Sequence, residues 1–344
     1  MSYNTRMDKW VLLGAKILQK QPQQEAKVGA GQVKVRVTHV LLSAFDALAY
    51  TGATKVAYPK TVGRVAVGVV TETGENCYGV SKGSRVYLNA VRPCTKCYAC
   101  KSGNKGECTS PQVAVRDFDG FLRDFVVCDY SEVTVLPDSV DDLLALCIEN
   151  VALAENIYDR LNLPTGSRVA IIGAGFLGTV LAQIALYHKL VPIVIDNYAS
   201  NIERLQNSGI FYTFAADDSL KSNIEDATSG SMCDAAIYTS NCKLTPSVPA
   251  SVLARKKDMV LGGFCNVNFS MDMTPLFEKN LRIYSVSDGY GYTEAAINML
   301  LHGALDITNF QKEVLKEFDP PALLADLAEK ATQDSKMTVL KLIL

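Results

Sequence analysis

The stretch Val169-Ala-Ile-Ile-Gly-Ala-Gly-Phe-Leu-Gly178 decides how this chain folds. Its first four residues predict a short buried strand, the glycines predict a turn, and the pattern from Leu177 onward predicts an amphipathic helix. The glycines fit G-x-G-x-x-G, in which the first permits a tight turn, the second lets the backbone approach a pyrophosphate, and the third lets helix and strand pack closely. The start of the helix would offer N–H groups to the phosphates. The residues predicted to bind the cofactor at this turn are Gly173, Gly175, Phe176, Leu177 and Gly178.

A second apolar run ends in Asp196, 18 residues after Gly178. A carboxylate at this place would hydrogen-bond the ribose hydroxyls and repel a 2′-phosphate, so it favours NAD over NADP. NADP stays open, because Tyr198 and Asn201 could line the ribose pocket in either case. A strand, turn and helix without a ligand is the competing interpretation, and the acid at the expected spacing argues against it.

Length and composition predict a globular chain of two domains. The 344 residues are 48% hydrophobic and 20% charged, with a formal net charge of −2. This balance, without a basic tract, argues against a nucleic-acid partner. We expect no signal peptide and no membrane span, because the one long uncharged run, residues 169–187, is explained by the strand, turn and helix. Ten cysteines, several of them isolated in apolar surroundings, favour a reducing cytoplasm over a disulfide framework.

The hydrophobic period changes along the chain. Between Trp10 and Val135, short alternating runs and glycine turns predict a small barrel or sandwich. Ser139 is expected to cap a helix that follows, and from Val169 strands and helices alternate as in a doubly wound parallel sheet. The tail predicts two helices, near 292–302 and 321–333, and a closing strand at 337–344. We expect this tail to complete the β-rich domain, so that the dinucleotide-binding domain is inserted into it.

The most specific motif is Cys94-x2-Cys97-x2-Cys100-x7-Cys108. Four thiolates at this spacing suit one tetrahedral zinc ion, and they leave no open coordination position, so the predicted site is structural. Disulfides and an iron–sulfur cluster are the alternatives. The expected compartment disfavours the first, and the spacing disfavours the second. The loop also carries positive side chains that would offset the excess thiolate charge, namely Arg92, Lys96, Lys101 and Lys105.

A four-cysteine lobe in a β-rich domain, followed by a dinucleotide-binding domain, resembles the zinc-containing medium-chain alcohol and polyol dehydrogenases. The similarity includes Pro59-x3-Gly63, Gly68-Val-Val-Thr-Glu-Thr-Gly74 and the run from Gly166 to Gly175. It implies a GroES-like β-barrel catalytic domain, a Rossmann domain, an active site in the cleft between them, and a homodimer or homotetramer. The expected domains are 1–145 (catalytic, with the zinc lobe at 92–109), 146–285 (Rossmann, NAD-binding) and 286–344 (completing the catalytic domain).

The chain departs from this family at the catalytic zinc. The family binds that ion through a cysteine three residues before an aspartate, the histidine of a Gly-His-Glu motif, and a further cysteine or acid. Here the first motif is Ser43-Ala-Phe-Asp46, the second is Gly63-Arg64-Val65, and Glu149 falls in the third ligand region. A hydroxyl is a poor zinc ligand and a guanidinium cannot be one, so we expect no catalytic zinc. Phe45 replaces the proton-relay residue, and His39, His188 and His302 are expected to pack or face solvent.

Without that ion, Arg64 is the predicted group that holds a carbonyl or anionic substrate oxygen, with Ser43, Asp46 and Glu149 around it. Two structural alternatives remain: Arg64 pairs with Asp46 or Glu149 and fills the vacated space, or Asp46 only supports folding. The predicted function is an NAD(H)-dependent oxidoreductase acting on a small alcohol, carbonyl or polyol, or on an activated alkene. The alternative function is a dinucleotide-binding sensor or assembly protein without catalysis. A metal held by Ser43, Asp46 and Glu149 is a third possibility, which two zinc ions per chain would reveal.

Overall fold

The computed structural model describes residues 7–239, 244–245, 247–263, 270–308, 310–330 and 336–342. The chain forms two compact units. The first contains residues 1–149, 312–329 and 337–344, and the second contains 150–311 and 330–336. Residues 286–311, which the sequence had grouped with the catalytic domain, thus belong to the second unit, and the first boundary falls at 149 rather than 145.

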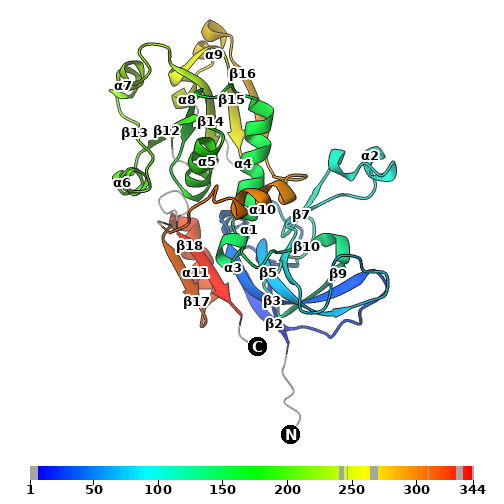
Figure 1. Ribbon diagram of the computed structural model, residues 1–344. Coiled ribbons are helices and arrows are strands. Elements are labelled where there is room, and N and C mark those ends of the chain that lie inside the picture. Colours follow the sequence, from blue (N-terminus) through cyan, green and yellow to red (C-terminus); the bar gives the residue numbers. More distant parts are fainter. Residues whose placement is uncertain are drawn as a thin grey trace. The chain divides into compact units, whose positions relative to one another are not determined.

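The first unit is built on three antiparallel or mixed sheets (Figure 1). One has the strand order β2-β1-β4, and a larger one has the order β10-β6-β5-β3-β18-β17, with β9 paired to β3. A third, β7-β8, belongs to the segment that carries the cysteines. The bounds are β1 Asp8–Gly14, β2 Ile17–Pro22, β3 Gln32–Leu42, β4 Lys60–Thr61, β5 Val65–Thr73, β6 Arg85–Leu88, β7 Val91–Arg92, β8 Gln112–Val113, β9 Phe125–Asp129, β10 Val133–Val135, β17 Lys312–Leu315 and β18 Met337–Lys341.

Strand β3 is the centre of the larger sheet because its alternation buries one face completely. Val33, Val35 and Val37 have no exposed surface, as the period-two pattern predicts. The pairing of β3 with β5 is interrupted by register shifts, one of them next to Gly68, where a Cβ atom would lie 2.4 Å from the Arg36 carbonyl oxygen. On its other side β3 pairs antiparallel with β18, so the C-terminal strand extends the N-terminal sheet.

Short helices connect these strands. Their bounds are α1 Ala44–Thr51, α2 Tyr98–Lys101, α3 Asp142–Ala145 and α11 Pro320–Lys330, and α4 Ile148–Leu161 begins in the first unit and continues in the second. Asp141, rather than the expected Ser139, caps α3, because its carboxylate accepts a hydrogen bond from the Leu144 backbone N–H at 2.9 Å. Two 3-10 turns, Lys105–Glu107 and Tyr130–Glu132, complete the unit.

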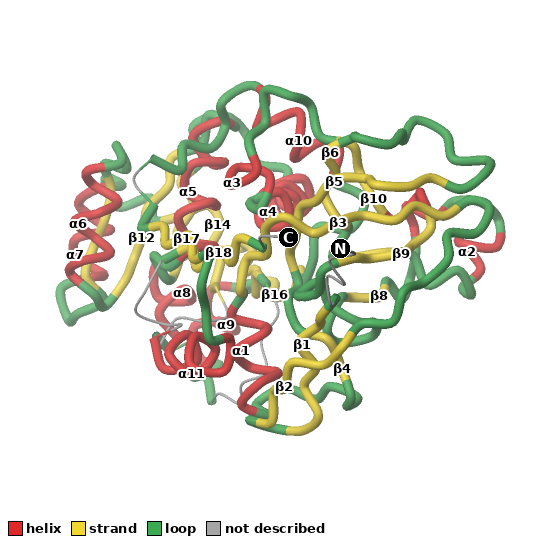
Figure 2. Tube along the Cα trace, turned by 90° about the horizontal axis from the view of Figure 1, so that it is seen from below, coloured by secondary structure: helices red, strands yellow, loops and turns green. Residues whose placement is uncertain are grey.

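The second unit contains one parallel sheet with the strand order β13-β12-β11-β14-β15-β16. This order reverses at β11 and confirms the predicted doubly wound Rossmann fold. Helices α6 and α7 lie at the β12–β13 end of the sheet in both views (Figures 1 and 2). The bounds are β11 Arg168–Ile172, β12 Val191–Asp196, β13 Tyr212–Ala215, β14 Cys233–Thr239, β15 Leu253–Gly262, β16 Arg282–Val286, α5 Phe176–Tyr187, α6 Ala199–Asn207, α7 Leu220–Ala227, α8 Ser247–Val252, α9 Thr274–Lys279 and α10 Thr293–Leu301.

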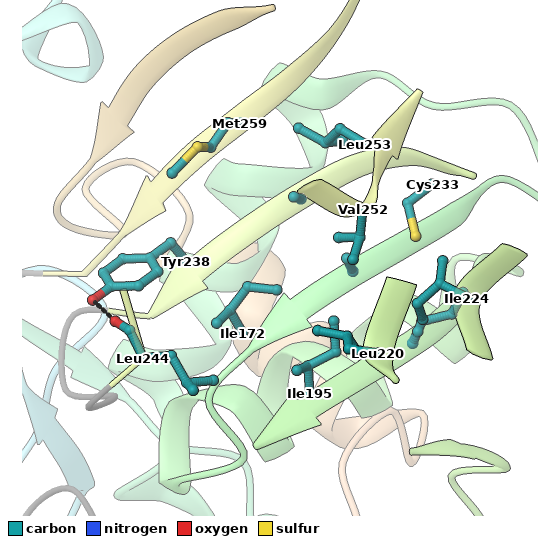
Figure 3. Close-up of a cluster of buried hydrophobic side chains, with 13 residues drawn as sticks. Ile172, Ile195, Leu220, Ile224, Cys233, Tyr238, Leu244, Val252, Leu253 and Met259 are labelled. Atoms are coloured by element: carbon teal, nitrogen blue, oxygen red, sulfur yellow. Dashed lines mark hydrogen bonds between the residues drawn. The ribbon is translucent and has the colours of Figure 1, made fainter. Parts of the chain in front are cut away.

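One face of this sheet packs against α7 and α8 in the cluster of Figure 3. Ile172 and Ile195, each without exposed surface, lie on neighbouring strands and meet Leu220 and Ile224 of α7. The Tyr238 hydroxyl in this layer is satisfied, because it donates to the Leu244 carbonyl oxygen at 2.8 Å. The core therefore fixes the carboxyl ends of β11 and β12, where the glycine turn and Asp196 lie.

A histidine at the end of α5 gives the second unit a pH-dependent contact. His188 Nε2 lies 2.5 Å from Glu155 Oε1 of α4, and the ring packs on Tyr158 with centroids 5.7 Å apart. The hydrogen bond with Glu155 outweighs desolvation and raises the pKa of His188 above its ordinary value. A raised pKa means that the protonated ring is bound more tightly in the folded state than in the unfolded chain.

We expect this pair to stabilise the protein fully below the ordinary histidine pKa, and to lose its contribution as the pH rises through the raised value. The melting-temperature difference between wild type and His188→Gln should therefore be larger at low pH than at high pH. The control is His302→Gln, because the His302 ring contacts the Asn298 carbonyl oxygen and forms no ion pair with a carboxylate among the described residues. A difference that grows with rising pH would contradict the assignment.

Candidate functional site

A buried ion pair joins two of the residues that the sequence predicts at the active site. Arg64, immediately before β5, donates through Nη2 to Glu149 Oε1 in the first turn of α4, in a short contact. The two side chains are only 8% and 13% exposed, so both charges are largely removed from water. The structure thus brings together Arg64 and Glu149, which the sequence places 85 residues apart.

The Arg64 guanidinium is not fully satisfied by this pair. Its Nε–H is buried and has no hydrogen-bond acceptor among the described residues. A buried donor of a charged group that lacks an acceptor is costly, on the order of a few kcal/mol. The arrangement therefore leaves one charge-assisted donor that an incoming oxygen atom could satisfy.

Asp46 has a different place in the site. It has no exposed surface, and its carboxylate accepts hydrogen bonds from the Ser43 hydroxyl at 2.7 Å and from the Gly63 backbone N–H at 2.7 Å. It also accepts from the backbone N–H groups of Ser43 and Arg64, and the Ser43 hydroxyl in turn caps α1. These contacts fix the turn that presents Arg64, so the geometry favours the structural alternative for Asp46 and Ser43.

Two aromatic side chains complete the surroundings of the ion pair. The Phe45 ring lies 5.2 Å from the Arg64 guanidinium carbon, in a cation–π arrangement. Tyr87 of β6 is buried, and this burial, together with the negative charge of Glu149, raises the pKa of its hydroxyl. Tyr87 therefore stays protonated at neutral pH. Sequence reasoning missed it, because a tyrosine in a buried strand carries no local signal of its neighbours.

The four cysteines form the other predicted site. Within the described residues they are the one group of three or more His, Cys, Asp or Glu side chains whose ligand atoms could hold a metal ion, and their sulfurs all lie within 4.8 Å of one another. The Sγ atoms of Cys94 and Cys100, and those of Cys97 and Cys108, are 4.0 Å apart. Four sulfurs about 2.3 Å from a central zinc would lie about 3.8 Å apart, so the donor set fits a tetrahedral ion and not two disulfides.

Backbone N–H groups turn toward these sulfurs. The N–H of Cys97 donates to Cys94 Sγ and that of Cys94 donates to Cys108 Sγ, both at 3.3 Å. Hydrogen bonds from the backbone of Cys100 and Thr109 lower the pKa of Cys97 to about 6. Both views show α2, which carries Cys100, at the periphery of the first unit (Figures 1 and 2).

The glycine turn has the geometry that a dinucleotide needs. Gly173 has a φ of 99°, which favours glycine, and a Cβ atom on Gly178 would lie 1.8 Å from the Gly173 carbonyl oxygen. A Cβ atom on Gly175, by contrast, would meet nothing within 4 Å, so open space lies at the start of α5. No side chain caps this helix. The backbone at Gly175 is thus open, as the approach of a phosphate to the start of this helix would require.

Asp196 lies at the end of β12, as expected, but its carboxylate already accepts hydrogen bonds from the protein backbone. It is 4% exposed and accepts from the Ala174 N–H at 2.6 Å and from the Tyr198 N–H at 2.7 Å. Arg204, which sequence reasoning did not single out, donates to the Ala174 carbonyl oxygen at 2.7 Å and to the Thr179 hydroxyl at 3.0 Å. Both charged side chains therefore hold the glycine turn in place.

Comparison with known proteins agrees with this architecture. Residues 29–138 match the alcohol dehydrogenase GroES-like domain. An uncharacterised zinc-type alcohol dehydrogenase-like protein of Haemophilus influenzae is 25% identical over 301 residues, 86% of this chain and 88% of that protein. Sorbitol dehydrogenase of Halalkalibacterium halodurans is 25% identical over 76% of this chain and 78% of its own length. The structure of the Escherichia coli alcohol dehydrogenase RspB in complex with NADH superposes with a TM-score of 0.82, at 23% identity, over 98% of this chain and 99% of that one.

A GroES-like domain with a four-cysteine lobe, joined to a Rossmann domain with a glycine turn, defines an alcohol-dehydrogenase-like oxidoreductase. The match over residues 29–138 and the similarity to zinc-type relatives along most of the chain support its place in the zinc-containing medium-chain dehydrogenase/reductase family. Among the helices that the structure describes, none has the length and apolar character needed to cross a bilayer.

Proposed function

We propose that the protein is an NAD(H)-dependent oxidoreductase that acts on a small alcohol, carbonyl or polyol without a catalytic zinc ion. Arg64 holds the substrate oxygen in place of the metal. The observation that carries this proposal is the buried Arg64 Nε–H without an acceptor, in the position where the family has its imidazole ligand. Sorbitol dehydrogenase and D-xylulose reductase among the relatives support a polyol or its ketone as the substrate class.

In this proposal each group has one role. NAD(H), held at the turn of Gly173, Gly175 and Gly178, supplies the hydride chemistry when it is bound. Glu149 orients the guanidinium by its ion pair, and Arg64 donates to the oxygen on which negative charge develops. Tyr87 cannot serve as a base, because its hydroxyl is held in the protonated form.

The preference for NAD over NADP rests on Asp196. A carboxylate here disfavours a 2′-phosphate, whereas Arg204, bound to the same turn, brings a positive charge that reduces this penalty. One structural relative, from Sinorhizobium meliloti, is bound to NADP. We therefore propose NAD as the preferred cofactor and expect weaker, measurable binding of NADP.

The four cysteines are proposed to hold one structural zinc ion. We expect elemental analysis of the purified protein to give one zinc per chain, and the variant Cys97→Ser/Cys100→Ser to give none. The control is Cys233→Ser, a buried thiol of β14 outside the lobe, which should keep the ion. Two zinc ions per chain would contradict the absence of a catalytic metal, and none would contradict the structural site.

The competing function is a dinucleotide-binding protein without catalysis, and the closed ion pair between Arg64 and Glu149 is the observation that favours it. An assay of NADH absorbance separates the two functions. It follows the formation of NADH with sorbitol and xylitol, and the consumption of NADH with fructose and xylulose. Turnover of any of these that saturates with substrate supports the oxidoreductase. Tight NADH binding without turnover on a broad panel of alcohols and carbonyls supports the non-catalytic function.

The family resemblance also leads us to propose a homodimer or homotetramer. Strand β16 is the edge of the Rossmann sheet, and Ile283 on it is 40% exposed. An unpaired edge of this kind can pair with a second copy of the chain.

A further inference from the structure

A second arginine of the first unit has a buried donor without an acceptor, beside a cavity whose lining includes neither Arg64 nor Glu149. Arg123 lies between Leu122 and the start of β9, and its Nε–H has no hydrogen-bond acceptor among the described residues. Its Nε atom is fully buried. Burial lowers the pKa of Arg123, and the nearby charge of Asp119 opposes this effect. A buried guanidinium N–H without an acceptor is destabilising unless something satisfies it.

Arg123 lines two cavities, and the one that it shares with Lys60, Arg92 and Asp119 has a volume of about 390 Å³, within the range of small-molecule sites. Its charged wall contains three cations and two acids. Arg92 is already paired with Glu132 at 2.7 Å, and its guanidinium carbon stacks 3.8 Å from the centre of the Phe118 ring. The remaining charged residues are Lys60, Arg123 and Asp119. Asp119 accepts a hydrogen bond from the Thr61 backbone N–H at 3.0 Å. The cavity thus keeps one positive charge in excess.

Apart from Asn89 and Cys128, the rest of the wall is apolar. It is formed by two phenylalanine rings whose centroids are 6.2 Å apart and by aliphatic side chains of β6 and β9, namely Phe118, Phe121, Leu88, Val126 and Val127. A bare inorganic ion would leave this surface and most of the volume unused. A ligand with one negative charge and a small apolar body would use both parts of the wall.

We propose that this cavity is a binding site for a small monocarboxylate with an apolar or aromatic body, whose carboxylate is held by Arg123. A carboxylate matches the planar guanidinium and supplies the acceptor that the Arg123 Nε–H lacks. The site lies wholly within the first unit and includes neither Arg64 nor Glu149. Its lining therefore contains no residue that the proposed oxidoreductase chemistry uses.

The test is calorimetric titration of the full-length protein with benzoate, with its neutral analogue benzamide and with inorganic phosphate. We expect one benzoate per chain, and affinity about ten- to a hundredfold weaker in Arg123→Gln, because a charge-assisted hydrogen-bond pair is lost. Benzamide and phosphate should each bind at least about tenfold more weakly than benzoate. Arg116→Gln is the matched control, since Arg116 pairs with Asp117 and does not line the cavity.

The double variant Arg64→Met/Glu149→Gln should bind benzoate as the wild type does, which separates this site from the proposed active site. Arg123→Gln should also melt at or above the wild-type temperature, because it removes a buried charged group whose Nε–H has no acceptor among the described residues. Benzoate affinity unchanged in Arg123→Gln, affinity lost in the double variant, or phosphate binding equal to benzoate would each overturn the proposal.

Discussion

The double variant Arg64→Met/Glu149→Gln is expected to lower kcat/KM for the polyol or ketone substrate by about 10²–10³-fold, the usual cost of removing a preorganised donor to a developing oxyanion. The second substitution is needed because Arg64→Met alone would remove the guanidinium that pairs with the largely buried Glu149 carboxylate. Breaking a buried pair in this way destabilises a protein by about 3–5 kcal/mol. Met and Gln together fill similar space without an isolated charge, so the double variant should fold.

Three measurements accompany the rate. The melting temperature reports on folding, and the dissociation constant of NADH should stay unchanged, because the glycine turn belongs to the second unit. Arg64→Lys is the conservative variant: it keeps the charge and the pair with Glu149 but loses the planar fork, so we expect an intermediate rate. If the folded double variant retains kcat/KM within about twofold of the wild type, Arg64 fills space and the substrate oxygen is held by another group.

The sequence predicted those features that depend on local spacing. The glycine turn and the cysteine lobe are each set within fewer than 20 residues, so their residue types and intervals are enough to indicate their geometry. Apolar runs and helical patterns also predicted strands β11 and β12 and helices α5 and α10 of the second unit, whereas helices α6 to α9 were not predicted individually. Strands β13 and β17 were missed, because each has only four residues and no long alternating run.

The features that the sequence could not supply depend on contacts between distant segments. Arg64 and Glu149 were both named as site residues, and two pairings were left open for Arg64. Only the folded chain shows that Arg64 pairs with Glu149, whereas the Asp46 carboxylate accepts hydrogen bonds from backbone N–H groups. The sequence did not single out Arg123 or Arg204, because an arginine in a sequence does not reveal which groups its guanidinium will contact in the folded protein. Polar side chains that the fold leaves short of acceptors, such as Arg64 and Arg123, can be recognised only in the structure.

The second large effect is expected at the glycine turn, where the stability of Gly178→Ala can be compared with that of Gly175→Ala. Gly178→Ala is expected to destabilise the protein by at least about 2 kcal/mol, because the new methyl group would lie 1.8 Å from the Gly173 carbonyl oxygen and the backbone must move. Gly175→Ala should stay within about 1 kcal/mol of the wild-type stability, since its methyl group meets nothing within 4 Å and its φ of −66° suits alanine.

For NADH binding, Gly175→Ala is expected to have the large effect that Gly178→Ala has on stability. If the pyrophosphate occupies the open space at Gly175, the methyl group of Gly175→Ala should weaken NADH binding about tenfold or more while the protein stays as stable as the wild type. Urea unfolding and fluorescence titration with NADH measure the two effects separately. Gly175→Ala with unchanged NADH affinity would show that the dinucleotide does not approach this turn. The proposed cofactor site would then be wrong, even though the close packing of Gly178 against Gly173 remained.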